Sequence, residues 1–398
     1  MSLNLRNLGL LAAGQALGSS GVSMIVLVGG IVGSRLAPSP AWSTLPVAAM
    51  VVGMAVSSAP VALLMKRIGR RAGFLSGSLL AVLASGLGAL SMAWESFALL
   101  CVATALIGVN GAFVNQYRFA AAESADATQA GKAVSLVLVG GVLAGLLGPE
   151  LGRLGRDWFG TALFAGSFLL AGSLYAAAAL LLIFLRKTHS AGREQERVLE
   201  NRRPLGAILR QPQALTAILA GIVSYAVMTF TMTAAPISMQ VLDHHSLDQA
   251  GYVIQSHIVA MYLPSFFTGF LIARLGLSLV MLLGVLLLGG SAGVSLLGSQ
   301  LSLYWTALVL LGLGWNFLFV GGTILLTRVY RPEERFRVQG ANDLMVFGFQ
   351  AAASLLSGAA LFRLGWKTLN VLNLPFLILM LVVLLALQAS RARLRPEV

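Results

Sequence analysis

Cysteine, histidine and charge are all scarce in this sequence. Of its 398 residues, one is cysteine, four are histidine and 10% are charged. The single Cys101 excludes a disulfide framework and a thiolate metal site built from this chain. So few charged groups also exclude an ordinary soluble enzyme or binding domain, in which about a quarter of the residues carry charge.

Apolar residues are abundant instead. They make up 58% of the chain, and the mean hydropathy is +0.86. Runs of about 20 apolar residues recur along the whole chain, the length needed to cross a hydrocarbon core of about 30 Å. The sequence therefore predicts an all-α membrane protein with twelve transmembrane helices. The expected spans are 8–33, 43–65, 73–93, 97–119, 132–152, 159–185, 214–240, 249–272, 277–297, 303–327, 340–362 and 368–389.

The loops between these spans differ sharply in basic residues. If both termini are cytoplasmic, the inner loops and ends hold 22 of the 27 lysines and arginines and the outer loops hold 5. Cytoplasmic loops of membrane proteins carry such an excess, so the pattern predicts both termini inside. It also accounts for the net charge of +13, because basic residues beside spans are attracted to anionic lipid and need no nucleic-acid partner.

The longest polar segment divides the chain into two similar halves. We expect a six-helix half over 1–185, a cytoplasmic linker over 186–213 and a second six-helix half over 214–398. Gly108-Val-Asn110 matches Gly314-Trp-Asn316 at an offset of 206, and Arg67-Ile-Gly69 matches Arg274-Leu-Gly276 at an offset of 207. A duplicated unit of this kind is typical of transporters, whose substrates bind between the repeats near the bilayer centre.

Two residue pairs in the second half are candidates for metal binding. Met228 and Met232 are four residues apart, as are His257 and Met261, and on a helix that spacing puts each pair on one face. The short turn between the two spans predicts antiparallel neighbours, so that three thioethers and one imidazole converge. Thioether sulfur selects Cu(I), and imidazole also suits copper. Methionine packing is the alternative, but an ionisable residue such as His257 within a span is a functional candidate by default.

The loop after the second span resembles a motif of the major facilitator superfamily, which runs Gly-x-x-x-Asp-Arg-x-Gly-Arg-Arg. Residues 66–71 read Lys-Arg-Ile-Gly-Arg-Arg, with Ala62 at the glycine position and Lys66 at the acidic one. The segment 145–152, Gly-Leu-Leu-Gly-Pro-Glu-Leu-Gly, is similar to the glycine-proline motif often associated with proton antiporters in that superfamily. The resemblance implies alternating access between two six-helix halves.

Within the superfamily, the C-terminal half is similar to the CcoA-like copper importers, a subgroup that also includes members resembling riboflavin importers. The matching features are Met228-x-x-x-Met232 with Pro236, His257-x-x-x-Met261 with Pro264, Gly314-Trp315-Asn316-Phe317, and Arg337-Val-Gln339-Gly-Ala-Asn342-Asp343. The resemblance implies that the Met and His pairs handle copper. We therefore expect a copper importer of the bacterial inner membrane. We expect it to be monomeric, without enzymatic activity and without a permanently bound cofactor.

Other functions remain open on the residues alone. Import of a planar organic solute such as riboflavin would use aromatic side chains as stacking surfaces. The candidates for that role are Tyr225, Phe230, Tyr262, Phe266 and Trp315. Proton-coupled drug efflux is favoured by the glycine-proline motif, but no acid lies clearly at the bilayer centre. A membrane sensor that does not transport its ligand is disfavoured, because the sequence shows nothing like an appended signalling domain.

Further residues complete the set of candidates. Accessory ligands or polar cavity groups are Met24, Met50, Met54, Met239, His244, His245, Asn110, Asn316 and Trp315. Arg67, Arg70 and Arg274 are candidates for gating, because cations at helix ends bind carbonyls or loop acids. Glu150 and Asp343 are the acids nearest the membrane and are candidates for proton coupling. Packing, interhelical hydrogen bonding or a solvated turn are the structural alternatives for these residues.

Overall fold

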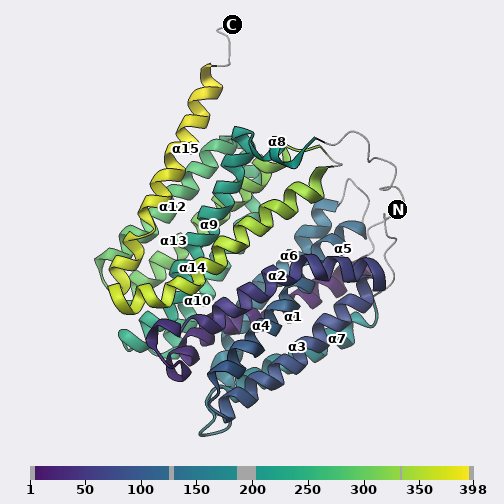
Figure 1. The fold of residues 1–398 in the computed structure, drawn as a ribbon, viewed down its shortest axis with the longest axis vertical. Coiled ribbons are helices and arrows are strands. Elements are labelled where there is room, and N and C mark those ends of the chain that lie inside the picture. Colours follow the sequence, from purple (N-terminus) through teal and green to yellow (C-terminus); the bar gives the residue numbers. More distant parts are fainter. Residues whose placement is uncertain (1–4, 125–129, 186–202, 332–333, 394–398) are drawn as a thin grey trace.

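The computed structural model describes residues 5–124, 130–185, 203–331 and 334–393, and these residues are helical almost throughout. Figure 1 shows the two halves as two groups of helices, with the N-terminal half in purple and blue. The first half contains α1 (Leu5–Leu36), α2 (Leu45–Ile68), α3 (Arg70–Ala93), α4 (Phe97–Asn115), α5 (Tyr117–Glu123), α6 (Ala130–Leu154) and α7 (Ala165–Leu182). The second contains α8 (Leu205–Leu209), α9 (Pro212–Ile237), α10 (Leu247–Tyr262), α11 (Ser265–Leu275), α12 (Leu277–Leu297), α13 (Leu301–Thr327), α14 (Arg335–Val371) and α15 (Leu374–Arg393).

These helices correspond to the twelve spans expected from hydropathy. Among the described residues, nine helical stretches are long and apolar enough to cross a membrane, and one of them, 337–389, contains the last two expected spans. The two spans outside these nine correspond to α6 and to the consecutive pair α10 and α11. The all-helical membrane fold is thus as the sequence predicts. The first part of the predicted linker, 186–202, lies outside the described residues.

Three spans are interrupted or shortened, each for a local reason. Pro264 lies between α10 and α11, and a proline cannot donate a hydrogen bond to the preceding turn. Gly365, at φ 76°, divides α14 from the approach to α15. The sixth span begins at Ala165 instead of residue 159, because Phe164 adopts φ 68° at its start and Gly160 φ 53° just before.

The duplication visible in the sequence recurs in backbone geometry. Gly69 joins α2 to α3 at φ 82° and ψ 160°, and Gly276 joins α11 to α12 at φ 84° and ψ 153°. Each glycine N–H donates to the carbonyl four residues earlier, at 2.9 Å. Positive φ is costly for residues with a Cβ, so both repeats use glycine at the same tight turn.

The two halves meet mainly near one end of the molecule, which the charge pattern predicts to be the outer end. α2 contacts α14, α6 contacts α10, and α1 contacts α9. At that end the Gly358 N–H of α14 donates to Thr44 Oγ1 at 3.3 Å, and Arg153 of α6 bonds to Asp248 of α10 at 2.6 Å. In Figure 1 the ribbons of the two halves converge at this end and diverge away from it.

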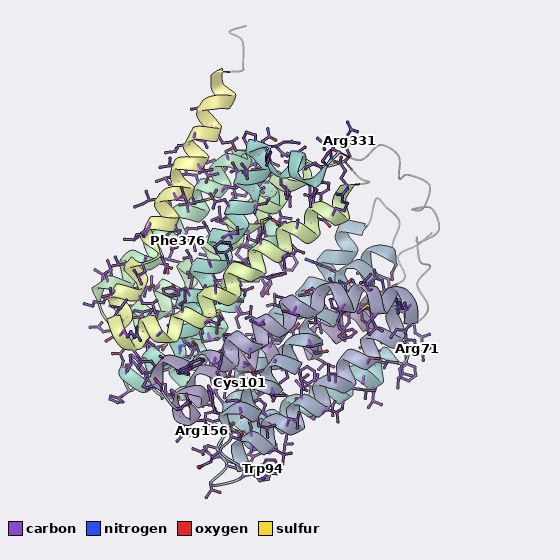
Figure 2. The ribbon with its side chains drawn as sticks, viewed as in Figure 1. Arg71, Trp94, Cys101, Arg156, Arg331 and Phe376 are labelled. Atoms are coloured by element: carbon purple, nitrogen blue, oxygen red, sulfur yellow. The ribbon has the colours of Figure 1, made fainter. Side chains whose placement is uncertain are left out.

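The opposite end carries the loops predicted to be cytoplasmic. Figure 2 shows Arg71 and Arg331 toward that side, and Trp94 and Arg156 at the far end of the N-terminal half. Here Arg203 anchors the described end of the linker to the turn before α14. Its guanidinium donates to both carboxylate oxygens of Glu334, at 2.9 and 2.6 Å, and to the Val329 carbonyl at 3.0 Å. Glu334 is almost completely buried by this contact.

Candidate functional site

An aromatic cluster occupies the C-terminal half where α9 packs against α13 and α14, and α13 packs against α10. Tyr225 of α9 is its centre. Its ring lies 5.2 Å from that of Trp315, 5.0 Å from that of Phe319 and 5.7 Å from that of Phe347, each in an edge-to-face arrangement. Aromatic pairs favour this geometry because the positive ring edge meets the negative face. We call Tyr225, Tyr262, Trp315, Phe319 and Phe347 the aromatic cluster.

Trp315 connects the cluster from one side to the other. It stacks on Phe319, one helical turn further along α13, with ring centroids 5.1 Å apart and planes inclined by 18°. Tyr262 of α10 contacts its other side, at 6.0 Å. Trp315 is buried, whereas the other four rings remain partly exposed. The indole Nε1 of Trp315 has no hydrogen-bond partner in the described part of the chain, so one buried donor is available to a bound molecule.

The neighbouring Asn316 fixes the position of Trp315. The Asn316 amide Nδ2 donates to the Met261 carbonyl at 2.7 Å and to Ser265 Oγ at 2.6 Å. Thr268 Oγ1 donates to the Asn316 Oδ1 atom at 2.8 Å. These bonds join α13 to the end of α10 and to α11, on both sides of the interruption at Pro264. Asn316 therefore serves to hold helices together and to orient the tryptophan beside it.

The methionine pair of α9 lies on the face that carries Tyr225. Met228 and Met232 follow Tyr225 by three and seven residues, which places all three on one helical stripe. Both methionines are buried, with 4% and 7% of their surface exposed. Thr229 Oγ1 lies 3.9 Å from Met228 Sδ. The two thioethers thus lie on the same face of α9 as Tyr225, as buried apolar side chains.

His257 is completely buried in α10. Its Nδ1 lies 2.7 Å from the Leu308 carbonyl of α13, and because a carbonyl oxygen only accepts, Nδ1 carries the proton. The Nε2 atom has no hydrogen-bond partner within the described ranges. Met261, one turn later, is also buried.

The sequence predicts that α9 and α10 are close neighbours, and this expectation is wrong, whereas the convergence of the two residue pairs stays a prediction. α9 and α10 each pack along α13 and touch one another only slightly. Between them, α9 continues into the π-helical turn η4 (Ser238–Leu242) after Pro236, and α10 begins at Leu247.

The remaining ligand candidates are mostly packed or bonded locally. Met24, Met50 and Met239 are buried in the hydrophobic core. Met54 accepts a weak bond from Asn115 at 3.5 Å, and Asn110 donates to the Gly18 carbonyl at 3.3 Å. His245 bonds to the Ser299 carbonyl at 2.8 Å, while His244 is exposed. Among the described residues, no group of three or more His, Cys, Asp or Glu side chains is placed to hold a metal ion.

The gating and proton-coupling candidates lie at the ends of the spans. Arg67 is exposed, Arg70 lies 3.5 Å from Gln116, and the Arg274 guanidinium lies 5.0 Å from the Phe270 ring. Asp343 accepts a hydrogen bond from its neighbour Asn342 at 3.1 Å. None of these contacts tests a role in gating or coupling, so those roles stay predictions.

Glu150 belongs to a polar network that joins the two halves at the predicted outer end. Arg153 donates to Glu150 Oε1 at 2.8 Å and to Asp248 Oδ1 at 2.6 Å. From the second half, Gln255 donates to Glu150 Oε1 and to the Leu146 carbonyl, both at 3.0 Å. We call Glu150, Arg153, Asp248 and Gln255 the outer network.

A model of the Major Facilitator Superfamily matches this sequence twice, over residues 8–244 and 217–397. The chain belongs to the major facilitator superfamily. Membership confirms the resemblance read from residues 66–71 and 145–152, and it identifies a transporter without enzymatic activity. The superfamily fold also accounts for the two halves and for the repeated glycine turns.

Several curated members of the superfamily are similar to the chain over nearly its full length. A riboflavin transporter of Brucella anthropi is 40% identical over 392 residues, covering 98% of this chain and 96% of that protein. Two uncharacterized transporters of Bacillus subtilis, YddS and YdeG, are each 31% identical, covering 96% and 90% of this chain and 90% and 86% of their own lengths. Of these three relatives, only the Brucella anthropi protein carries a substrate in its name.

Sequence reasoning found three of the five cluster residues and missed two. Tyr225, Tyr262 and Trp315 were candidates for stacking, whereas Phe319 and Phe347 were not. The four-residue spacing of Trp315 and Phe319 was a usable signal, because it puts both rings on one helical face. Phe230 and Phe266 have no ring contact recorded in the described structure, and half of the Phe266 surface is exposed.

Proposed function

We propose that this chain is a secondary transporter that imports riboflavin, or a planar heteroaromatic solute closely similar to it. The observation that carries the proposal is the aromatic cluster, in which four helices contribute five rings with centroids 5.0–6.0 Å apart. A flat ring system can stack on such side chains, and stacking on an aromatic residue contributes about 1–3 kcal/mol per ring. The riboflavin transporter of Brucella anthropi supports the same substrate class by its similarity over the whole chain.

The energetics suit a transporter. Stacking binds a ring without a covalent bond or a buried ion pair. A bound substrate therefore loses only one or two stacking contacts when it returns to water, and it is released readily. Transport would follow alternating access, in which the two halves open the central site to each side in turn. The contacts of the outer network and of Thr44 with Gly358 support a conformation closed at the outer end.

We do not extend the proposal to copper. Met228 and Met232 lie on the stripe of Tyr225, α9 and α10 scarcely touch, and methionine serves a flavin cavity equally well as apolar lining. In the proposed site both methionines therefore line the cavity as apolar side chains and do not bind a metal. His257, with its Nδ1 bonded to the Leu308 carbonyl, becomes part of the α10–α13 contact.

The orientation that we propose follows the charge pattern. Both termini and the linker face the cytoplasm, and the protein acts as a monomer in the inner membrane of a bacterium, with halves 1–185 and 214–398. In a variant with Cys101 replaced by serine, cysteine at the exposed Ala207 should be shielded from an impermeant thiol reagent in intact cells. Cysteine at the exposed Ser246 should be labelled. The reverse labelling pattern would overturn this orientation.

The decisive test of substrate is uptake by the purified protein in liposomes. We expect saturable uptake of labelled riboflavin that unlabelled riboflavin and lumiflavin inhibit and that cuprous ion, kept reduced, does not. Empty liposomes and liposomes with a Trp315→Ala variant serve as controls. Copper uptake by the parent protein without riboflavin uptake would refute the proposal and restore the copper hypothesis.

A further inference from the structure

One face of α14 carries an aromatic residue between polar ones. Asp343, Phe347, Gln350 and Ser354 are spaced by four, three and four residues. At 100° per residue, they fall within an arc of about 60° around the helix and rise about 16 Å along it. Phe347 belongs to the aromatic cluster through its contact with Tyr225. We call these four residues the α14 stripe.

Contacts on either side of the α14 stripe establish where it faces. Val346 lies where a side chain at Gly221 of α9 would have to be, and Ser357 Oγ donates to the Phe230 carbonyl of α9 at 2.7 Å. On the other side, the Gly358 N–H donates to Thr44 Oγ1 in the first half. At 100° per residue around α14, the stripe lies between the side of α14 that contacts α9 and the side that contacts the start of α2. It therefore faces the seam between the two halves.

Two side chains of the stripe are buried without hydrogen bonds. Gln350 has 8% of its surface exposed and Ser354 has none. The Gln350 Oε1 atom and the Ser354 Oγ atom have no partner anywhere in the described residues. Buried polar atoms without partners are uncommon because losing water is costly. They follow Phe347 by one and two helical turns, which places them in line with the aromatic cluster.

We propose that Gln350 and Ser354 form a hydrogen-bonding subsite for the polyhydroxylated chain of the substrate, while the aromatic cluster holds its ring. The inference rests on the proposed function and adds the selectivity of that site. A polyol hydroxyl both donates and accepts, so successive hydroxyls can bond to the Gln350 amide and the Ser354 hydroxyl. The substrate class is then a planar heteroaromatic ring with an attached sugar alcohol, as in riboflavin, and a bare ring binds less tightly.

Two ligands with the same ring distinguish the contribution of this subsite to binding from that of the aromatic cluster. Riboflavin carries the polyol chain, and lumiflavin has a methyl group in its place. Binding of each to the purified full-length protein is measured by quenching of flavin fluorescence. Gln350→Met nearly conserves volume, and Ser354→Ala removes only the hydroxyl. We expect riboflavin affinity to fall about five- to tenfold in Gln350→Met and about threefold in Ser354→Ala, with lumiflavin affinity unchanged.

Matched controls lie on the same helix. Ser357→Ala removes a serine whose hydroxyl is already bonded to Phe230, and Gln339→Met removes a glutamine bonded to Tyr330. Neither should change the ratio of riboflavin to lumiflavin affinity. If Gln350→Met does not fold, Ser354→Ala alone decides the matter.

The possible outcomes separate failure of the proposed subsite from failure of the proposed function. Equal loss of both ligands, or no loss of either, in the stripe variants overturns the subsite while leaving flavin binding intact. A parent protein that binds lumiflavin as tightly as riboflavin also overturns the subsite. A parent protein that binds neither flavin overturns the proposed function itself.

Discussion

The two halves share one fold but use their aromatic residues differently. In the N-terminal half, Tyr117 and Tyr175 are fully buried inside the bundle, where glycines of α1 leave room for them. In the C-terminal half, Tyr225 and Tyr262 remain partly exposed and contact Trp315. These two tyrosines of the first half thus fill the bundle, whereas Tyr225 and Tyr262 of the second half keep part of their surface open beside Trp315.

Repeat-related positions sharpen this difference. At the offset of 206 that relates Asn110 to Asn316, Trp315 corresponds to Val109 and Phe319 to Phe113. Phe113 is buried where a side chain at Gly77 of α3 would have to be, whereas Phe319 stacks on Trp315. A duplicated scaffold can therefore keep its packing asparagines while one copy specialises in substrate contact, and substitutions in that copy should have the larger effects on transport.

The largest effect is expected at Trp315. Trp315→Leu removes the ring that joins Tyr262 to Phe319, and loss of one stacking surface of about 1–3 kcal/mol corresponds to a loss of riboflavin uptake of about 5- to 150-fold. Val109→Leu, at the corresponding position of the first half, should leave uptake unchanged. The measurement is initial uptake normalised to protein in the membrane. Similar losses in both variants would show that the halves do not differ in this way.

A second comparison concerns the paired asparagines. Asn316 makes hydrogen bonds to Met261, Ser265 and Thr268, whereas Asn110 makes a longer bond to Gly18. Asn316→Leu should destabilise the protein by about 2–3 kcal/mol and Asn110→Leu by about 1 kcal/mol, because more buried partners lose their bonds. Thermal unfolding in detergent measures the difference. A greater loss in Asn110→Leu would contradict the assignment of the stronger helix contact to the second half.

A smaller effect is expected where the halves meet. Arg153→Met leaves Glu150 and Asp248 without their cation. The three side chains are 35–70% exposed, so each pair is worth at most about 1 kcal/mol after solvent screening. The population open to the outside should rise about two- to fivefold, measured as reactivity of a cysteine placed at the buried Ile258. Arg156→Met, whose pair with Asp157 lies within one half, is the control.

The smallest effect is expected at Met228. Leucine conserves its volume and apolar character, so Met228→Leu should keep riboflavin uptake within about twofold of the parent. The same measurement on Met232→Leu tests whether the two methionines act alike as lining. Loss of transport in both variants, with normal amounts of folded protein, would mean that sulfur itself is needed and would revive metal chemistry at this stripe.

Hydropathy and the superfamily motifs predict most of the fold. The spans follow from the lengths of apolar runs, and the glycine turns at Gly69 and Gly276 follow from the repeated Arg-x-Gly pattern. The interruption between α10 and α11 and the late start of the sixth span have local causes, Pro264 and the positive φ of Phe164, but neither follows from the length of an apolar run.

The site is less predictable from sequence than the fold. Trp315 and Phe319 belong together by spacing alone, but Phe347 joins them from a helix more than twenty residues away in the sequence, and no local pattern links it to Tyr225. Arg153 and Asp248 are separated by 95 positions, and their pairing depends on how the halves close. The short connection between α9 and α10 suggested that the two helices are close neighbours, but each packs mainly along α13.

The clamp between Arg203 and Glu334 bears on the question of which carboxylates could carry a coupling proton. The hydrogen bonds from Arg203 lower the pKa of Glu334 from its ordinary value near 4.5 to about 2. Because the folded-state pKa is the lower one, the stabilisation is complete above about pH 4.5 and is lost only as the pH falls toward 2. At any pH near neutrality the carboxylate is ionised and the contact between Arg203 and Glu334 is kept. Glu334 therefore holds its ion pair with Arg203 throughout and does not carry a proton. A proton-coupled transport cycle would have to use acids elsewhere in the chain, such as Glu150 and Asp343.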